Sequence, residues 1–341
     1  MAAGQFLSVG YGNVGQAVPE RAAELGLEQS PLVVRSDAIY ALEDGSRFDK
    51  GEEFWADPEV IKGVDAAFIA MPSFDDGERA RDIIKGLVNN GIAVVTAEKG
   101  ALANHYAELE PMMENIGISA TVGGGTQMMP SLALKLNSRT RQVHAIVNGT
   151  LNFVVDGIAN GRTAGQTIDE AVKLGYAEPG ASNHLEVMNG ELVGDIPKKA
   201  SILWNTVFRP VFAPDQVLSH TDLEQPELNQ ENLSRLIAEA GSRRYILSIV
   251  REDDELPEED TIVGFREEVD DGWVIMGGFR RITDNPLFQP LKIAGPGNGA
   301  VIANGPDESD GTYVVGSGPG AGPGPTAAAM VQDARQILRA N

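Results

Sequence analysis

The chain has 341 residues, 42% of them hydrophobic and 22% charged, with a formal net charge of −22 at pH 7 and no cysteine. This length fits two domains with separate cores. The negative charge argues against nucleic acid as a partner, because binding a phosphate backbone requires a basic surface. Without cysteine there are no disulfides or cysteine-ligated metal centres, and we expect no metal site.

Hydropathy along the chain argues against a membrane location. No apolar run approaches the roughly 20 residues that span a bilayer. The amino terminus has no basic start followed by an apolar stretch, as a signal peptide would have. We therefore expect a cytoplasmic protein that does not bind membranes.

Strand and helix patterns alternate over the first third of the chain. Short apolar runs predict strands, and charged segments with apolar residues at helical spacing predict helices. The alternation favours an α/β fold, with a parallel sheet covered by helices on both faces. The predicted strands are Gln5–Val9, Leu32–Arg35, Ala66–Met71, Ile92–Thr96 and Ile118–Val122, and the predicted helices are Asn13–Leu25, Asp76–Asn89 and Tyr106–Asn115.

The pattern changes near residue 130, where an α+β arrangement begins. We predict a doubly wound nucleotide-binding domain over residues 1–130, to which residues 318–341 return, and a second domain over residues 131–317. The predicted helices here are Leu151–Ala159, Thr167–Leu174, Pro197–Val207 and the final Thr326–Leu338, and the predicted strands are Val143–Val147, Tyr245–Val250, Thr261–Glu267, Trp273–Met276, Val301–Asn304 and Tyr313–Val315.

A glycine-rich turn joins the first predicted strand to the first helix. Gly10 permits a tight turn, Gly12 lets the backbone approach a pyrophosphate, and Gly15 lets the helix pack close to the strand. The following helix would offer the N–H groups of its first turn, around Asn13 and Val14, to phosphates. This pattern predicts a Rossmann-type dinucleotide site. The alternative is a tight strand–helix turn without a ligand.

Two side chains near the end of the second predicted strand indicate which cofactor the protein binds. An acidic residue there would accept hydrogen bonds from the ribose of NAD, whereas an arginine would hold the additional phosphate of NADP. The chain has both, as Arg35 and Asp37. We favour NADP because of Arg35 and keep NAD open.

Further motifs follow the phosphate loop in a fixed order. They are Met71-Pro72-Ser73, Val94–Ala103, Val147–Phe153, Leu174–Pro179, Asp195–Lys199 and Gly318–Thr326. In this order and spacing they resemble homoserine dehydrogenase, which interconverts L-homoserine and L-aspartate 4-semialdehyde in threonine and methionine biosynthesis. The resemblance runs from Gly10 to about Gln336. It implies a catalytic and dimerisation role for the second domain, a homodimer, and the short form without a carboxy-terminal regulatory domain.

The resemblance assigns proton transfer and substrate orientation to Lys99, Asp195 and Lys199. A lysine can donate a proton to a carbonyl oxygen and stabilise the developing alkoxide. On a helix, Asp195 and Lys199 would share one face; a helix cap with a surface ion pair is the alternative for this pair. By the same resemblance Thr150, Tyr176 and Glu178 contact the substrate. The resemblance also places further residues at the cofactor, together with the glycine-rich turn. They are Met71, Pro72, Ser73, Thr96, Asn148, Gly149, Gly320, Gly322 and Thr326.

The chain departs from the family mainly around the substrate. Glu98 stands where the family usually has asparagine, and it adds negative charge beside Lys99. The segment 180–194 is longer than expected, and the family's second substrate-binding acid has no clear match, although Glu186 or Glu191 could replace it. Two alternatives therefore stay open. The enzyme could act on another small amino or hydroxy acid, or the protein could be a non-catalytic NAD(P)-binding sensor.

Overall fold

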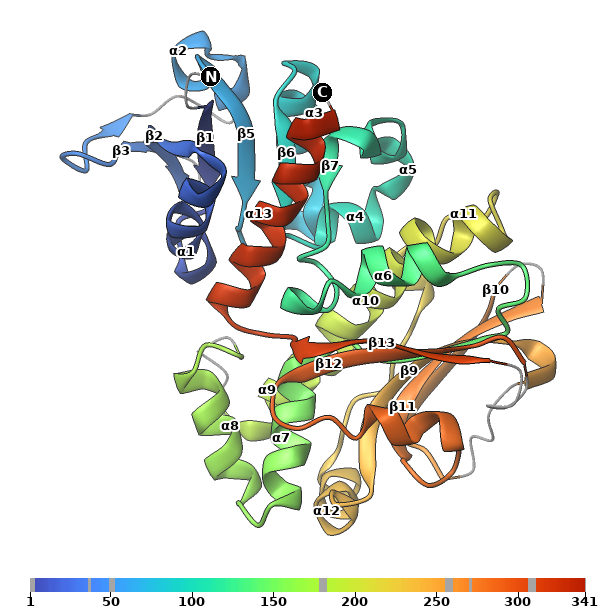
Figure 1. The fold of residues 1–341 in the computed structure, drawn as a ribbon. Coiled ribbons are helices and arrows are strands. Elements are labelled where there is room, and N and C mark those ends of the chain that lie inside the picture. Colours follow the sequence, from blue (N-terminus) through green and yellow to red (C-terminus); the bar gives the residue numbers. More distant parts are fainter. Residues whose placement is uncertain are drawn as a thin grey trace. The chain divides into compact units, whose positions relative to one another are not determined.

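The computed structural model describes residues 4–35, 38–48, 53–177, 183–254, 260–269, 272–305 and 311–340 (Figure 1). The chain divides into two compact units. Unit 1 comprises Met1–Thr121 and Pro323–Asn341, and unit 2 comprises Val122–Gly322. Each unit is described by itself below. The domain limits predicted from the sequence stay a prediction.

In the described residues of unit 1, seven strands form one sheet in the order β4-β3-β2-β1-β5-β6-β7. The pairs β1–β2, β1–β5, β5–β6 and β6–β7 are parallel, and β3 and β4 add an antiparallel edge beside β2. The strands are β1 (Gly4–Val9), β2 (Leu27–Arg35), β3 (Ala38–Ala41), β4 (Arg47–Phe48), β5 (Val64–Ile69), β6 (Ala93–Thr96) and β7 (Ile116–Gly117).

Helices cover both faces of this sheet. Phe6 of β1 and Phe68 of β5 pack in one buried cluster with apolar side chains of the first and last helices, including Val18 and Met330. The helix α3 contacts β6, and its apolar side chains lie outside that cluster. The helices of unit 1 are α1 (Asn13–Ala22), α2 (Pro58–Ile61), α3 (Glu78–Asn89), α4 (Gly100–Asn104), α5 (Tyr106–Leu109) and α13 (Pro323–Ala340). The predicted doubly wound fold is confirmed.

The strand predicted at Ile118–Val122 is wrong, because β7 ends at Gly117 and the chain then turns. Both the backbone N–H and the hydroxyl of Thr121 donate to the carbonyl of Ile118, at 2.9 and 2.7 Å. The N–H of Ser119 donates to the carboxylate of Asp333 on α13 at 2.7 Å. These bonds use groups that a longer strand would pair with its neighbour. Burial raises the pKa of Asp333.

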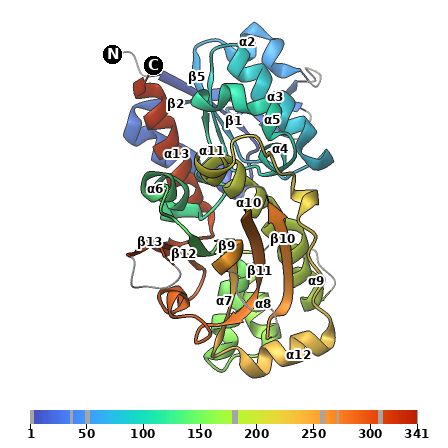
Figure 2. The ribbon, with the colours of Figure 1, turned by 90° about the vertical axis from the view of Figure 1, so that its right-hand side faces the viewer.

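In the described residues of unit 2, six strands form an antiparallel sheet in the order β10-β11-β9-β8-β12-β13. Strand β8 lies between β9 and β12, so its backbone is paired on both sides, and all of its residues are buried. Figure 2 shows β9, β11 and β10 side by side. The strands are β8 (Gln142–Ile146), β9 (Arg243–Arg251), β10 (Ile262–Val269), β11 (Trp273–Arg281), β12 (Gly297–Ala303) and β13 (Thr312–Pro319).

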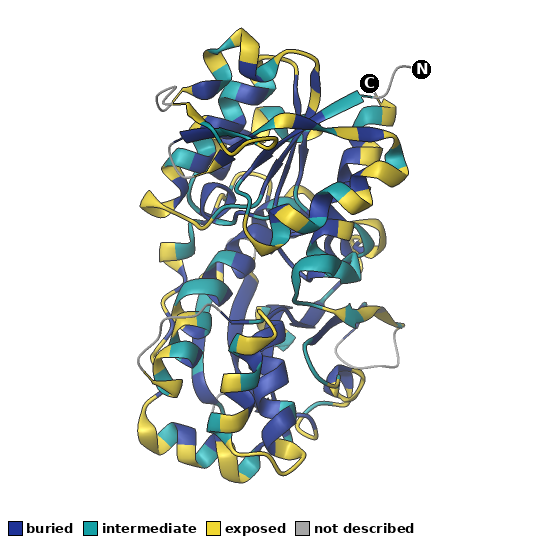
Figure 3. Cartoon of the chain, turned by 90° about the vertical axis from the view of Figure 1, so that its left-hand side faces the viewer, coloured by how far each residue is buried: buried dark blue, intermediate teal, exposed yellow. Residues whose placement is uncertain are grey.

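The helices of unit 2 include two π-helical turns. One, Gly190–Asp195, precedes α10, and the other, Trp204–Phe208, follows it, so the single helix predicted over Pro197–Val207 is interrupted. Within each unit the strands are largely buried and the outer helix faces exposed (Figure 3). The α-helices are α6 (Met128–Lys135), α7 (Gly149–Ala159), α8 (Ala164–Lys173), α9 (His184–Asn189), α10 (Ile196–Leu203), α11 (Arg209–Phe212) and α12 (Gln230–Glu239).

A charged network joins the end of α12 to β9 and β11. The fully buried Arg243 pairs with Glu239 at 2.7 Å and with Asp260 at 2.9 Å. Arg281 pairs with the same Glu239 oxygen at 2.6 Å. Hydrogen bonds from Arg243 and then Arg281 lower the pKa of Glu239 to about 2. The carboxylate therefore stays ionised in the folded protein at pH values well below those at which a free glutamate takes up a proton.

This network predicts a pH-dependent contribution to stability. Because the pKa of Glu239 is lower when folded than when unfolded, its contribution is complete above about pH 4.5, the ordinary value, and falls as the pH approaches 2. Glu239→Gln should lower the free energy of unfolding at pH 7 and flatten its decline with acid, as measured by denaturant titrations at several pH values. As a control, Glu224→Gln at an exposed position should keep the wild-type dependence of the free energy of unfolding on pH. Parallel profiles for wild type and Glu239→Gln would contradict the assignment.

Candidate active site

The turn after β1 has the backbone geometry that the sequence predicts. Gly10 has a φ of +87°, and its N–H donates to the carbonyl of Val34 at 2.8 Å. A Cβ at Gly10 would lie 2.3 Å from the carbonyl oxygen of Ala70, and a Cβ at Gly15 would lie 2.2 Å from that of Gly10. Only glycine fits these two positions.

Gly12 differs from its two neighbours, because a Cβ built there would meet nothing within 4 Å. The structure therefore leaves an open approach to the backbone at the start of α1. The first turn of α1 carries no acidic side chain, so its N–H groups and partial positive charge stay available to an anion. Asn13 and Val14 lie in this turn. The cradle fits the pyrophosphate of a dinucleotide.

Arg35 lies at the carboxyl end of β2, next to this turn. Its guanidinium carbon is 5.1 Å from the ring centroid of Tyr11 and 5.6 Å from that of Tyr40. Two aromatic faces therefore hold an exposed cation beside the phosphate turn. An arginine fixed in this way suits a phosphate ester. Asp37 lies outside the described residues.

The next two parallel strands end in a hydrogen-bonded group around Glu98. The buried Glu98 carboxylate accepts the hydroxyl of Ser73 and the backbone N–H groups of Gly100 and Ala101, the last at 3.0 Å. The hydroxyl of Thr96 accepts from the N–H of Glu98 at 3.0 Å. The carboxylate thus caps α4, where the helix dipole favours negative charge.

Lys99 occupies the N-cap position of α4, directly after Glu98. It is half-buried, and Met71 and Pro72 follow the neighbouring strand β5. The turn between β6 and α4 is therefore fixed by Glu98, the residue that departs from the family pattern. The added charge beside Lys99 is visible in the sequence, but the capping role of Glu98 is not, because it depends on the backbone N–H groups around the carboxylate.

In unit 2, Asn148 connects two carboxylates. Its Nδ2 donates to Glu191 at 2.6 Å and to Asp195 at 2.8 Å. Lys199 Nζ lies 2.6 Å from the same Asp195 oxygen and donates to the carbonyl of Val147 at 2.8 Å. The Lys199 side chain is 11% exposed and that of Asp195 16%. We call Asn148, Glu191, Asp195 and Lys199 the carboxylate–lysine cluster.

Local structure explains how this cluster forms. Asn148 follows β8 and caps α7, because its Oδ1 accepts from the N–H of Leu151 at 2.7 Å. That bond fixes the side-chain amide with its Nδ2 toward the carboxylates. Glu191 and Asp195 lie in the π-helical turn before α10, and Lys199 is one α-helical turn beyond Asp195. Single π-helical turns often occur at functional sites.

The structure distinguishes the two acids that the sequence left open. Glu191 joins the cluster, whereas Glu186 belongs to the cap of α9: its N–H donates to Asn183 Oδ1 and its carboxylate accepts from Asn183 Nδ2, both at 3.0 Å. With both acids ionised and the lysine protonated, the cluster has a net charge of −1. Such a site favours a ligand that brings an ammonium group.

The other predicted substrate contacts lie near the start of α7. The buried Thr150 donates its hydroxyl to the carbonyl of Tyr176 at 2.5 Å. The Tyr176 ring packs edge-on against Phe153, with centroids 5.2 Å apart. This arrangement fixes the chain just before Glu178, which lies outside the described residues.

The predicted carboxy-terminal glycine loop is shorter than expected. Gly318 lies within β13, residues 320–322 form the connection, and Thr326 lies in the first turn of α13. Gly320 N–H donates to the carbonyl of Pro296 at 2.9 Å. A Cβ at Gly149 would lie 3.0 Å from that of Ala321, so this connection packs against the residue after Asn148.

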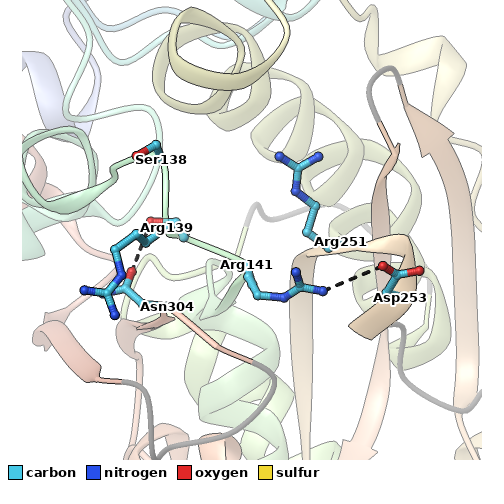
Figure 4. A pocket seen from close by; sticks show the side chains of 7 residues that line it. Ser138, Arg139, Arg141, Arg251, Asp253 and Asn304 are labelled. Atoms are coloured by element: carbon cyan, nitrogen blue, oxygen red, sulfur yellow. Dashed lines mark hydrogen bonds and ion pairs between the residues drawn. The ribbon is translucent and has the colours of Figure 1, made fainter.

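A separate pocket of about 480 Å³ lies at the opposite end of β8 from Asn148 (Figure 4). Arg141 there pairs with Asp254 at 2.5 Å and lies 3.9 Å from Asp253. None of the predicted catalytic, substrate or cofactor residues contributes to it. The lining residues are Ser138, Arg139, Thr140, Arg141, Arg251, Asp253 and Asn304.

The described residues contain neither a candidate metal site nor a candidate membrane-spanning helix. No group of three or more histidine, aspartate or glutamate side chains is arranged to hold a metal ion there. Likewise, no helix in the described part of the chain has the length and apolar character to cross a membrane.

Comparisons with known proteins agree on one family. A family model for homoserine dehydrogenase matches residues 131–334. Homoserine dehydrogenase of Corynebacterium glutamicum is 30% identical over 227 residues, 61% of this chain and 48% of that protein. The chain spans only 48% to 60% of the first curated relatives it matches.

Solved structures share the fold over almost the whole chain. The homoserine dehydrogenase of Thermoplasma acidophilum matches with a TM-score of 0.71 at 22% identity, over 98% of this chain and 99% of that one. A hyperthermophilic archaeal homoserine dehydrogenase in complex with NADPH matches with a TM-score of 0.63 at 20% identity, over 99% and 98%. At this level of identity the likeness establishes the fold.

Proposed function

The chain belongs to the homoserine dehydrogenase family, and we propose that it interconverts L-homoserine and L-aspartate 4-semialdehyde with NADP or NAD. The observation that carries this proposal is the carboxylate–lysine cluster, in which Lys199 is hydrogen-bonded to Asp195 and Val147. A protonated, oriented amine beside two carboxylates suits a substrate with an amino group and a reacting oxygen. When bound, the nicotinamide supplies or accepts the hydride.

Lys199 is the proposed proton donor in the reducing direction. An ammonium has three N–H donors, and Asp195 and Val147 engage two of them. The third would point to the carbonyl oxygen and deliver its proton as the carbonyl carbon is reduced. Lys199 would then be neutral and regain a proton from solvent. In the oxidising direction the same nitrogen, in its neutral form, would accept the hydroxyl proton.

Asp195 and Asn148 would orient this lysine, and Glu191 would attract the substrate ammonium. We assign Glu178 to the same ammonium, and Thr150 and Tyr176 to the wall beside the substrate. Lys99, in unit 1, has the proposed companion role of proton transfer and substrate orientation. The remaining proposed cofactor residues are Gly10, Gly12, Asn13, Val14, Gly15, Arg35, Asp37, Met71, Pro72, Ser73, Thr96, Asn148, Gly149, Gly320, Gly322 and Thr326.

The test is an assay of purified protein with L-homoserine and either NADP⁺ or NAD⁺, followed by nicotinamide absorbance. We expect homoserine-dependent reduction of at least one cofactor. The same assay should include other small amino alcohols and hydroxy acids, because the segment 180–194 departs from the family spacing. Preference for one of those would replace homoserine as the substrate. Binding of cofactor without turnover on any alcohol would identify a sensor.

Arg35 is the proposed determinant of NADP preference. Removing its guanidinium in Arg35→Ala should raise the KM for NADP⁺ about tenfold or more, because a charge-assisted bond to the ribose phosphate is lost. The KM for NAD⁺ should change little. Arg21→Ala on the exposed side of α1 should leave both constants unchanged. An equal rise for both cofactors would refute a role in phosphate recognition.

We also propose a homodimer formed through unit 2. Strand β13 is an edge strand whose Tyr313 and Val314 are 43% and 58% exposed. Leu134 on α6, which contacts β13, is 85% exposed. Exposed apolar side chains along an unpaired edge favour association with a second copy. Sedimentation of wild type against Val314→Lys, which should be monomeric, tests this proposal.

A cytoplasmic location is proposed because the reaction draws on the cell's nicotinamide dinucleotides.

A further inference from the structure

Asn298 is a fully buried polar residue whose side chain is unsatisfied. It lies in β12 with none of its surface exposed. In the described structure neither its Nδ2 nor its Oδ1 has a hydrogen-bond partner. Buried side-chain amides are normally paired, since removing one from water without replacing its bonds lowers stability. An apolar side chain of similar volume would serve this conformation of the fold better.

Asn205 shows the usual state of a buried asparagine in unit 2. It too is fully buried, but its Nδ2 donates to the carbonyl of Leu218 at 2.7 Å and its Oδ1 accepts the N–H of Leu218 at 2.9 Å. Both halves of this amide are satisfied within the protein. Asn205 is therefore a suitable control for Asn298: both are fully buried, but only the Asn205 amide has hydrogen-bond partners in the described structure.

The unused amide faces the connection between β13 and α13. A Cβ at Gly320 would lie 2.1 Å from the Cγ of Asn298, 2.2 Å from its Oδ1 and 2.4 Å from its Nδ2. On another side, a Cβ at Gly124 would lie 2.7 Å from the carbonyl oxygen of Gly320. The backbone of Gly320 thus runs between the Asn298 amide and Gly124. Neither Gly320 nor Gly124 has room for a Cβ.

Two glycines with positive φ, Gly316 within β13 and Gly322 in the connection, allow the backbone around this segment to bend, and the connection touches the proposed site. Gly316 and Gly322 have φ values of +49° and +106°, which other residues rarely adopt. Ala321 packs against Gly149, the neighbour of Asn148 in the carboxylate–lysine cluster. A shift of the Gly320–Gly322 segment would therefore change both the environment of Asn298 and the contact at Gly149.

We propose that Asn298 is a positioning residue for the Gly320–Gly322 segment in the dinucleotide-bound enzyme. In that state the segment moves so that the Ala321 N–H and a backbone C=O of the segment pair with the Asn298 amide, while the Gly320 N–H keeps its bond to the Pro296 carbonyl, and Ala321 is held against Gly149. The Asn298 amide is unsatisfied in the described structure, and the proposed arrangement satisfies it. These bonds exist only in the bound state, so they increase cofactor affinity. The inference rests on the proposed function, because it requires a dinucleotide ligand.

The test compares Asn298→Leu with Asn205→Leu. For each variant, the melting temperature without ligand and the dissociation constants for NADPH and NADH are measured, the latter by nicotinamide fluorescence. Asn298→Leu should melt at or above the wild-type temperature yet bind the preferred dinucleotide about 5- to 50-fold more weakly, as expected for one or two lost hydrogen bonds. Asn205→Leu should melt lower and bind with wild-type affinity.

Hydrogen exchange gives a second readout. In wild type, NADPH or NADH should slow exchange in residues 316–322, and in Asn298→Leu that protection should be absent. The isosteric Asn298→Asp, which replaces the NH₂ donor with a second acceptor oxygen, serves if the leucine variant does not fold. It should also bind more weakly.

The outcomes separate this proposal from the proposed function. A lower melting temperature for Asn298→Leu with unchanged dinucleotide affinity would overturn the positioning role and leave the dehydrogenase intact. Weaker binding by Asn298→Leu in an enzyme that does not oxidise homoserine would support the role and reject the substrate. If wild type binds neither dinucleotide, both proposals fail.

Discussion

Replacing Lys199 with methionine is expected to lower kcat/KM for homoserine oxidation by about 10²- to 10⁴-fold, the range for loss of a general acid–base group. Methionine keeps most of the side-chain volume but cannot transfer a proton or bond to Asp195 and Val147. Dinucleotide binding should persist, because the phosphate turn lies in unit 1. Initial rates at varied homoserine, together with NADPH titration, separate the chemical defect from a binding defect.

Lys198→Met is the matched control. Lys198 is adjacent in sequence and more exposed, and it lies outside the carboxylate–lysine cluster. Its replacement should leave kcat/KM within about threefold of wild type, as for a surface substitution. Melting temperatures of both variants show whether the fold is retained. A folded Lys199→Met enzyme with wild-type kcat/KM would remove this lysine from the mechanism.

The second large effect is expected at the glycine-rich turn after β1. Substitution of Gly12 should lower dinucleotide affinity, whereas substitution of Gly10 should lower the stability of the fold. Gly12→Val places a side chain in the open approach to α1, so dinucleotide affinity should fall by about 10- to 100-fold. Its φ of −82° suits any residue and nothing surrounds its Cβ position, so the melting temperature should be unchanged. NADPH fluorescence titration and thermal melts test both statements.

Gly10→Ala provides the contrast. With a φ of +87° and a Cβ position 2.3 Å from the carbonyl oxygen of Ala70, this substitution should destabilise the fold by about 1–3 kcal/mol. The melting temperature should fall even without ligand. Equal losses of stability at both positions would mean that Gly12 serves packing and not ligand approach.

The sequence determined the features that depend on local pattern. Alternating apolar runs predicted the strands β1, β5 and β6, because a buried parallel strand needs a short apolar run. The spacing of Gly10, Gly12 and Gly15 indicated the turn geometry, since each glycine meets a separate steric requirement. The four-residue interval from Asp195 to Lys199 predicted their pairing, because a helix brings such residues to one face.

Only the tertiary structure decided which acid joins the cluster and where β7 ends. Asn148 binds Glu191 and Asp195 from 43 and 47 residues away, and no local pattern distinguishes Glu191 from Glu186. Likewise Ser119 turns toward Asp333, which is 214 residues further along the chain. Glu98 and Asn298 have no periodic signature either, because their roles depend on which backbone atoms surround them. Such long-range polar contacts follow from packing, which sequence spacing does not encode.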